Sequence, residues 1–108
     1  MKVLVIGDSC KDIFVYGRCD RLAPAGPVPV FVPMCSRKNK GMAGNVYENL
    51  LSLKTFETEL ITNKTEIIKT RYVDERTNHM FVRVDSGEDR VERIEEIEKI
   101  KFSDYSAV

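Results

Sequence analysis

Two groups of small and polar residues in the first half of the sequence could bind a ligand. Asp8 and Asp12 follow soon after the apolar run 3–6, and the glycine-rich run 41–44 precedes Asn45. Carboxylates and a side-chain amide can hydrogen-bond a polar ligand, and glycines let that ligand approach the backbone. We therefore expect one candidate site, where the segment after residue 6 meets the segment that begins at Gly41.

The first group is positioned by a predicted strand. Val3, Leu4, Val5 and Ile6 form a continuous apolar run that ends in Gly-Asp, which is typical of a strand buried on both faces of a parallel sheet. Ligands of open α/β sheets bind at the carboxyl ends of such strands. Asp8 could belong to such a site, or it could only cap a turn, and the sequence leaves both interpretations open.

The second group is positioned by a predicted helix. Val46, Leu50 and Leu53 lie at positions i, i+4 and i+7, a spacing that places one apolar stripe on a helix. Asn45 then lies in or near the first turn, where free N–H groups favour a polar or anionic ligand. The alternative is a glycine-rich turn in which Asn45 is only the helix cap.

The segments between these groups predict mainly strands. All four prolines lie between residues 24 and 33 and alternate there with apolar residues, which indicates an extended strand at a sheet edge or in a lid. The basic run 35–40 is interpreted as a solvated loop, with phosphate binding by Arg37, Lys38 or Lys40 as the less favoured alternative. Residues 58–62 predict another strand.

The second half of the sequence predicts a hairpin and a helix. Runs 67–73 and 80–85 flank a segment rich in turn-forming residues, which indicates a β-hairpin. Lys69 and Arg71 share one face of it, and a solvated outer face is the ordinary interpretation of such cations. Apolar residues recur every third position through 91–100, which predicts an amphipathic helix with an acidic exposed side.

The composition limits the class of protein. The 108 residues suffice for one domain, and 17 basic against 17 acidic side chains argue against a nucleic-acid or membrane-surface partner. The apolar runs are too short for a membrane span or a signal peptide, so we expect a cytoplasmic protein. Three cysteines without a C-x-x-C pair indicate reduced thiols, and the single histidine, His79, indicates a loop or strand residue and not a metal ligand.

Four segments in this order resemble the amino-terminal part of ribokinase/PfkB-type carbohydrate kinases. They are similar to that family's first strand and loop, its proline-containing segment, its Gly-Gly-Ala-Ala-Asn-Val motif and its lid hairpin. The closest branch is the heptose 7-phosphate kinase part of ADP-heptose synthases. The segments are VLVIGDSCKDIFVYG (3–17), RLAPAGPVPVF (21–31), GMAGNV (41–46) and IIKTRYVDERTNHMFVRVD (67–85).

The resemblance implies a fold and a set of binding residues. The fold would be α/β, a truncated ribokinase-like Rossmann-type sheet with a β-lid, in which residues 1–108 form the N-terminal part of the kinase domain. Lid elements would cover about 12–34 and 67–85. The implied substrate-binding residues are Asp8, Asp12, Gly41, Met42, Gly44, Asn45 and Lys69.

Each of these residues has an implied role. Asp12 and Asn45 would hydrogen-bond sugar hydroxyls, Gly41 and Gly44 would let the backbone approach the sugar, and Asp8 would support the loop. Lys69 would reach a substrate phosphate. Met42 replaces a glycine of the family motif and would narrow or reshape the sugar site.

The resemblance also implies a reaction, the transfer of the ATP γ-phosphoryl group to a sugar hydroxyl in a complete enzyme that uses ATP and Mg²⁺. The Gly-Ala-Gly-Asp motif, which supplies the anion hole and the catalytic base in that family, is absent from these 108 residues. We therefore expect no catalytic residue here, no ATP or Mg²⁺ binding by this chain alone, and a fragment or a split or truncated gene product.

Two other functions are compatible with parts of the sequence. A non-catalytic module could bind a sugar or sugar phosphate and form a homodimer through its β-lid, as relatives do. A Rossmann-like nucleotide-binding domain would explain the strand at 3–6, but GDSCKD lacks the glycine-rich turn that holds a pyrophosphate. The nucleotide-binding interpretation is therefore the least favoured.

Overall fold

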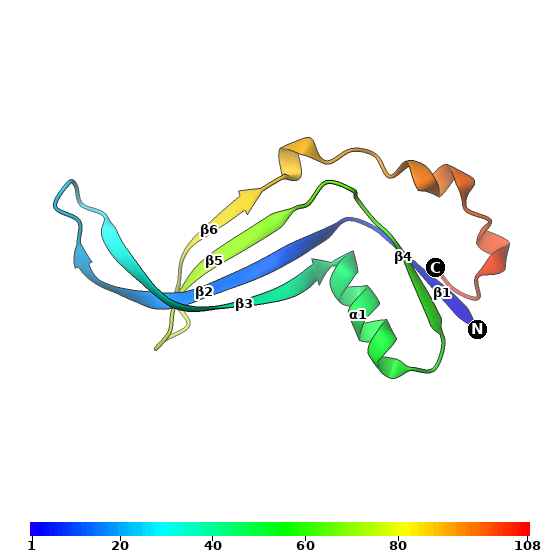
Figure 1. Cartoon of the computed structure of the whole chain (residues 1–108), viewed down its shortest axis with the longest axis horizontal. Helices are drawn as coiled ribbons and strands as arrows, with labels where there is room; N and C mark the ends of the chain where they lie inside the picture. Colours follow the sequence, from blue (N-terminus) through cyan, green and yellow to red (C-terminus); the bar gives the residue numbers. More distant parts are fainter.

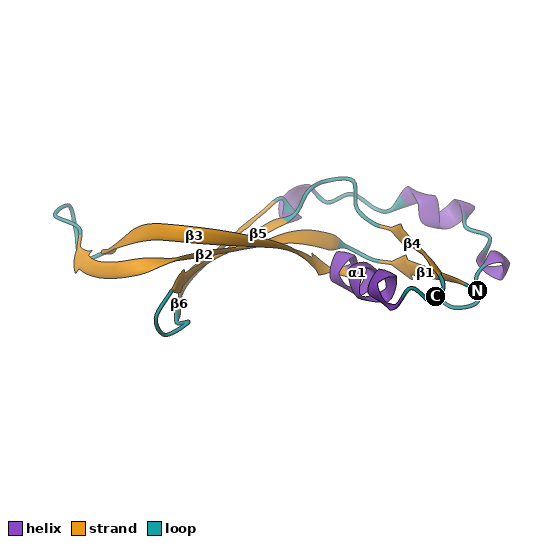
Figure 2. Ribbon diagram, turned by 60° about the horizontal axis from the view of Figure 1, so that its bottom comes forward, coloured by secondary structure: helices purple, strands orange, loops and turns teal.

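The computed structural model describes all 108 residues, which form two sheets and one α-helix (Figures 1 and 2). Three short 3₁₀ turns follow the last strand. The elements are β1 (Lys2–Ile6), β2 (Ser9–Leu22), β3 (Pro29–Met42), α1 (Ala43–Leu53), β4 (Glu57–Ile61), β5 (Ile68–Asp74), β6 (Met80–Ser86), η1 (Glu88–Arg90), η2 (Glu95–Lys99) and η3 (Phe102–Asp104). The combination of strands and a helix gives the chain the α/β character that the sequence predicts.

The smaller sheet is parallel and contains both termini of the chain. Strand β1 pairs with β4 on one side and, through Val3, with Ala107 on the other. The predicted strands at 3–6 and 58–62 are therefore confirmed. The predicted burial of both faces of β1 is wrong. Only Leu4, which is 1% exposed, is buried, and the other residues of β1 stay partly exposed. Helix α1 is the one helix that packs against this sheet, and it leaves part of the sheet uncovered.

The larger sheet has the strand order β3-β2-β5-β6 and projects away from the helix (Figure 2). Strands β2 and β5 are parallel, whereas the two outer pairs are antiparallel. The predicted hairpin is confirmed as β5 and β6. The prediction for the proline-containing segment is also confirmed, because β3 is an edge strand and Pro24 and Pro27 lie in the turn before it.

Residues 35–40 do not form the predicted solvated loop. They are part of β3 and pair in register with residues 11–16 of β2. Lysine-rich edge strands are common because charged side chains discourage pairing with another chain. The polarity of this run therefore reflects its exposed edge position and not a loop conformation.

The predicted amphipathic α-helix at 91–100 is also wrong. Within this segment only Glu95–Lys99 is helical, and it forms a 3₁₀ helix with no buried residue. A 3₁₀ helix has three residues per turn, which matches the spacing of Ile94, Ile97 and Ile100 better than the 3.6 residues of an α-helix. Without a packed apolar face, an α-helix of this length has little to stabilise it.

The two faces of the larger sheet differ in chemistry. Side chains alternate along each strand, and residues paired across strands point to the same side. One side, the charged face, carries Asp12, Phe14, Arg37, Lys69, Arg71, Arg83 and Asp85; the other, the apolar face, carries Ile13, Val15, Phe31, Tyr72, Val82 and Val84.

The apolar face has no cover within the chain. Val82 and Val84 are about half exposed, and only nine of the 108 residues are buried. The molecule measures 61 × 30 × 15 Å, and its radius of gyration is 18.7 Å, compared with about 13 Å for a compact chain of this length. No helix of the structure has the length and hydrophobicity needed to cross a membrane.

Gly17 allows the edge strand to pack closely on the apolar face. The ring of Phe31 reaches across β2 to Tyr72 and Phe81, with ring centroids 5.4 Å and 5.9 Å apart. A Cβ atom at Gly17 would lie 2.6 Å from the Phe31 ring and would also clash with the carbonyl oxygen of Val32. The aromatic contact therefore depends on the absence of a side chain at position 17.

We expect Gly17→Ala to lower the free energy of unfolding by about 1–3 kcal/mol, the usual cost of overpacking. The matched control is Gly26→Ala, because a Cβ atom there meets nothing within 4 Å. Urea unfolding followed by circular dichroism measures both variants. Equal midpoints for the two would show that Phe31 does not lie across Gly17.

The three thiols should differ in reactivity towards iodoacetamide. All are free; Cys10 is buried, Cys19 is intermediate and Cys35 is exposed on the edge strand. Burial raises the pKa of Cys10, and the nearby Asp12 carboxylate adds to the rise, so less of the reactive thiolate is present near pH 8. Peptide mass spectrometry should find Cys35 alkylated first and Cys10 last. Faster labelling of Cys10 than of Cys35 would contradict the placement of these strands.

Candidate functional site

Four of the predicted binding residues line one open groove, built by β2, β3 and the start of α1. They are Asp12, Gly41, Met42 and Asn45, and the other lining residues are Phe14, Lys38, Asn39, Lys40 and Glu48. Asn45 lies in the first turn of α1, as predicted. The alternative in which Asn45 caps the helix is wrong, because Met42 occupies the N-cap position.

The Asp12 carboxylate is held firmly on one side. Arg71 Nη1 donates a hydrogen bond to Asp12 Oδ1 at 2.7 Å, and the Cys10 thiol lies 3.8 Å from the same oxygen. The other oxygen, Oδ2, faces Gly41, where a Cβ atom would come within 2.5 Å of it. The absence of a side chain at Gly41 therefore lets the Asp12 carboxylate and the Cys10 thiol pack against the backbone of β3.

Met42 has a strained backbone. Its φ is 56° and its ψ is −132°, a combination that glycine adopts readily and that costs other residues roughly 1–3 kcal/mol. This explains physically why a glycine suits this position in the motif that the segment resembles. The Met42 side chain is 45% exposed and lines the groove.

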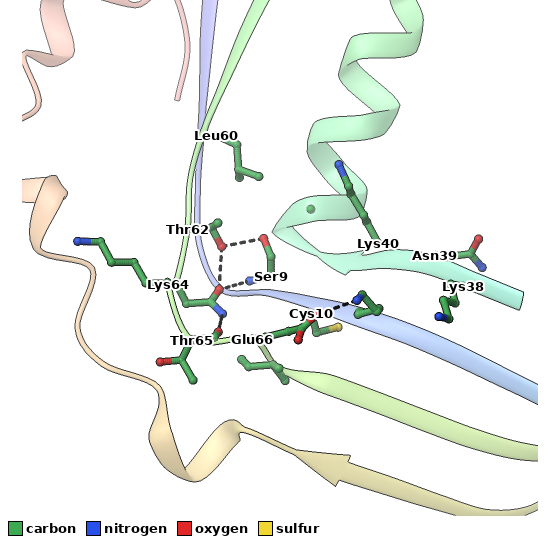
Figure 3. Close-up of a pocket in the computed structure, with 14 residues that line it drawn as sticks. Ser9, Cys10, Lys38, Asn39, Lys40, Leu60, Thr62, Lys64, Thr65 and Glu66 are labelled. Carbon is green, nitrogen blue, oxygen red and sulfur yellow. Dashed lines mark hydrogen bonds and ion pairs between the residues drawn. The ribbon is translucent and has the colours of Figure 1, made fainter.

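Gly44 lies in a neighbouring cavity of about 520 Å³, at the carboxyl ends of β1 and β4 (Figure 3). A hydrogen-bond network crosses this cavity: Asn63 Oδ1 accepts from the Ser9 amide at 2.7 Å, and Thr62 Oγ1 donates to Ser9 Oγ at 2.7 Å. Asn63 Nδ2 also donates to the carbonyl oxygen of Thr65. Thr62 and Asn63 are not among the predicted site residues, although their position at the end of a predicted strand parallels that of Asp8 after β1.

Asp8 lies outside the groove that contains Asp12. Its side chain is exposed, and its carbonyl oxygen accepts a hydrogen bond at 3.0 Å from the Ala43 amide. The residue thus ties the β1–β2 connection to the start of α1. It borders a separate apolar groove between β1 and α1.

Lys69 lies beside Asp12 in the register between β5 and β2. Its ammonium group contacts Glu88 at 3.1 Å, and this hydrogen-bonded pairing raises the pKa of Lys69. The side chain is only 19% exposed. Its positive charge is therefore close to the groove, but a carboxylate of η1 already engages it.

The groove offers groups that suit the recognition of hydroxyls. Asp12 Oδ2 is an acceptor, the Asn45 amide can both donate and accept, and Gly41 and Met42 also line the groove. The structure contains no cluster of three or more His, Cys, Asp or Glu residues that could hold a metal ion. The arrangement can thus bind and orient a polar ligand.

No protein-family model matches the chain. The curated relatives include the bifunctional protein HldE from two Helicobacter pylori strains, P12 and ATCC 700392 / 26695, with 47% and 49% identity over 53 residues. The same protein from Campylobacter curvus is 42% identical over 53 residues. The matched segment covers 49% of this chain but only 11–12% of these relatives.

Among solved structures, a carbohydrate kinase from Agrobacterium tumefaciens aligns with 79% of this chain and 35% of its own. The TM-score is 0.40 and the identity is 11%, which is below the level that identifies a shared fold. The HldE proteins, in contrast, are more than 40% identical to this chain over the matched half. The similarity of half of this chain to the HldE proteins supports its resemblance to the amino-terminal portion of ribokinase-type carbohydrate kinases.

Proposed function

We propose that this chain is the sugar-binding and lid portion of an ATP-dependent carbohydrate kinase that phosphorylates a hydroxyl of a heptose phosphate-like sugar. The observation that carries the proposal is the groove in which Asp12, Gly41, Met42 and Asn45 converge. In this proposal the parallel sheet and α1 belong to a truncated ribokinase-like core, and the four-stranded sheet is the β-lid. The relation to the HldE proteins supports it.

Each groove residue has a role in the proposed binding mode. Asp12 Oδ2 accepts a hydrogen bond from one sugar hydroxyl, while Arg71 holds the opposite oxygen of the same carboxylate. The Asn45 amide bonds a neighbouring hydroxyl, and Gly41, which has no side chain, lets the Asp12 carboxylate take its place in the groove. Lys69 reaches a substrate phosphate only by exchanging its contact with Glu88.

ATP and Mg²⁺ are the phosphoryl donor and the metal ion that we propose for the complete enzyme. ATP supplies the transferred group, and Mg²⁺ neutralises the charge that develops on it. We propose that these 108 residues alone bind neither, since they carry neither the Gly-Ala-Gly-Asp motif nor a cluster of metal-ligating side chains. Their contribution is to bind and orient the sugar, in the cytoplasm.

The proposal predicts sugar binding without turnover. A heptose 7-phosphate should bind the 108-residue chain in calorimetry. Asp12→Asn should weaken the binding about tenfold or more, because a hydrogen bond to a charged group contributes about 1.5–3 kcal/mol, and Asn45→Ala should weaken it by less, because a neutral hydrogen bond contributes about 0.5–1.5 kcal/mol. The matched control is Asp20→Asn, which removes an exposed carboxylate outside the groove.

Two results would contradict this proposal. An equal loss of affinity in the Asp20 variant would remove the groove as the sugar site. Sustained ADP release from ATP and sugar by the chain alone would show that the phosphoryl-transfer machinery is present after all.

A second candidate function is a non-catalytic module that dimerises through the β-lid, and the apolar face of the larger sheet favours it. That face carries Val82 and Val84, both about half exposed, next to the Phe31 aromatic contact. A second copy of the chain would cover this surface, and burial of apolar area stabilises such an association by roughly 25 cal/mol per Å² before the costs of binding.

Light scattering tests this second candidate. The chain should have the mass of a dimer, and Val82→Glu should convert it to a monomer because a carboxylate would be buried in the interface. The matched control is Val28→Glu, since Val28 is similarly exposed but lies in the turn before β3. A monomeric wild-type chain at high micromolar concentration would rule out the module.

A further inference from the structure

The strand register aligns three arginines and one phenylalanine in a single row across all four strands of the larger sheet. Phe14 of β2 pairs with Arg37 of β3 on one side and with Arg71 of β5 on the other, and Arg71 pairs with Arg83 of β6. Directly paired residues share a face. These four residues, the arginine row, therefore lie together on the charged face.

Side-chain contacts hold two members of the row on one aromatic ring. The guanidinium carbon of Arg71 lies 5.1 Å from the centre of the Phe14 ring, and that of Arg37 lies 6.0 Å from it. Both distances fall within the range of cation–π attraction. Phe14 thus contacts the guanidinium groups of both Arg37 and Arg71.

The charges of this region do not cancel. Arg71 contacts Asp12 at 2.7 Å, Arg83 contacts Asp85 at 2.9 Å, and Lys69 contacts Glu88 at 3.1 Å. Arg37 forms no ion pair in the structure. Four positive side chains therefore face three carboxylates, and the uncompensated charge lies at the end of the row nearest β3.

Folding alone does not favour such a row. Like charges directly opposite each other across two strands are destabilising, and Arg71 and Arg83 are directly opposite. An anion placed over the row would remove this repulsion. The planar fork of arginine suits the oxygens of a phosphate, which it can bind with two parallel hydrogen bonds.

The row borders the groove that contains Asp12 and Asn45. Phe14 lines that groove. Arg71 connects the groove with the arginine row, because it contacts both Phe14 and Asp12. We infer that the arginine row is an anion subsite, which takes the phosphate group of a phosphorylated sugar. The position of the sugar hydroxyls at Asp12 and Asn45 rests on the proposed function, whereas the anion subsite itself rests on the row alone.

For Arg37 this assignment agrees with the less favoured interpretation of the run 35–40, and it differs from the resemblance, which implies that Lys69 reaches the substrate phosphate. Lys69 already contacts Glu88, whereas Arg37 is exposed and has no acidic partner. The run 35–40 was expected to be a loop, and in a loop Arg37 has no fixed neighbour. Its place in β3 is what brings it to Phe14.

Phosphorus-31 NMR titration with inorganic phosphate tests the subsite in the 108-residue chain. The wild-type chain should bind phosphate, and added sodium chloride should weaken the binding because the site is open to solvent. Arg37→Gln and Arg83→Gln should each weaken it about fivefold or more, as expected for the loss of a charge-assisted contact. The matched control is Arg21→Gln, an exposed arginine of the same sheet that pairs with Val30 outside the row.

Absence of phosphate binding to the wild-type chain, or an equal loss in the Arg21 variant, would overturn the inference. A second titration, by calorimetry, compares a heptose with its 7-phosphate. Equal affinities for the two, both weakened by Asp12→Asn, would refute the anion subsite and leave the proposed hydroxyl site intact. Binding of the 7-phosphate that depends on Arg37 but is indifferent to Asp12→Asn would support the subsite and refute the proposed sugar position.

Discussion

The register of β2 is the constraint on which the larger sheet and the candidate site both depend. Strand β2 lies between β3 and β5, and the Asn63 side chain fixes its start by accepting a hydrogen bond from the Ser9 amide. A shift by one residue would move every side chain of β2 to the opposite face. Asp12 would then leave the groove, and Phe14 would leave its two arginines.

The larger sheet is stabilised mainly by pairing between its strands and little by burial. Gly17 and Val73 are among the few buried residues in it, and most of its ion pairs are partly exposed, where each contributes about 0–1 kcal/mol. Isolated strand pairs are marginally stable in water and need an apolar face to pack against something. The apolar face of this sheet is thus the surface whose burial would add most to the stability of the chain.

Local sequence signals predicted most of the elements. Alternation and turn-forming residues located the hairpin of β5 and β6, and the prolines identified β3 as an edge strand. The prediction of a loop at 35–40 is wrong because polarity alone does not distinguish an exposed edge strand from a loop, and here pairing with β2 makes the run a strand. The prediction of an α-helix at 91–100 is wrong because a period of three does not by itself specify an α-helix, and this segment has no surface to pack against.

The candidate site was predictable only in part, for a related reason. Asp12 and Asn45 stand out by residue type and by their place near the ends of predicted elements. The arginine row does not, because Arg37, Arg71 and Arg83 are far apart in the sequence and meet only through the register of three strand pairs. Cross-strand register depends on pairing between distant segments, which single-sequence patterns do not specify.

The alternation of β2 separates the two surfaces of the larger sheet. Asp12 and Phe14 face the groove and the arginines, while Ile13 and Val15 face the opposite side. Ligand binding and association with another chain would therefore use different side chains of the same strand. A ligand that touched both Asn45 on α1 and Arg71 on β5 would also bridge the helix and the larger sheet, which the ion pair between Lys40 of β3 and Glu48 of α1 already joins. Part of its binding energy would then stabilise the packing of the helix against the sheet.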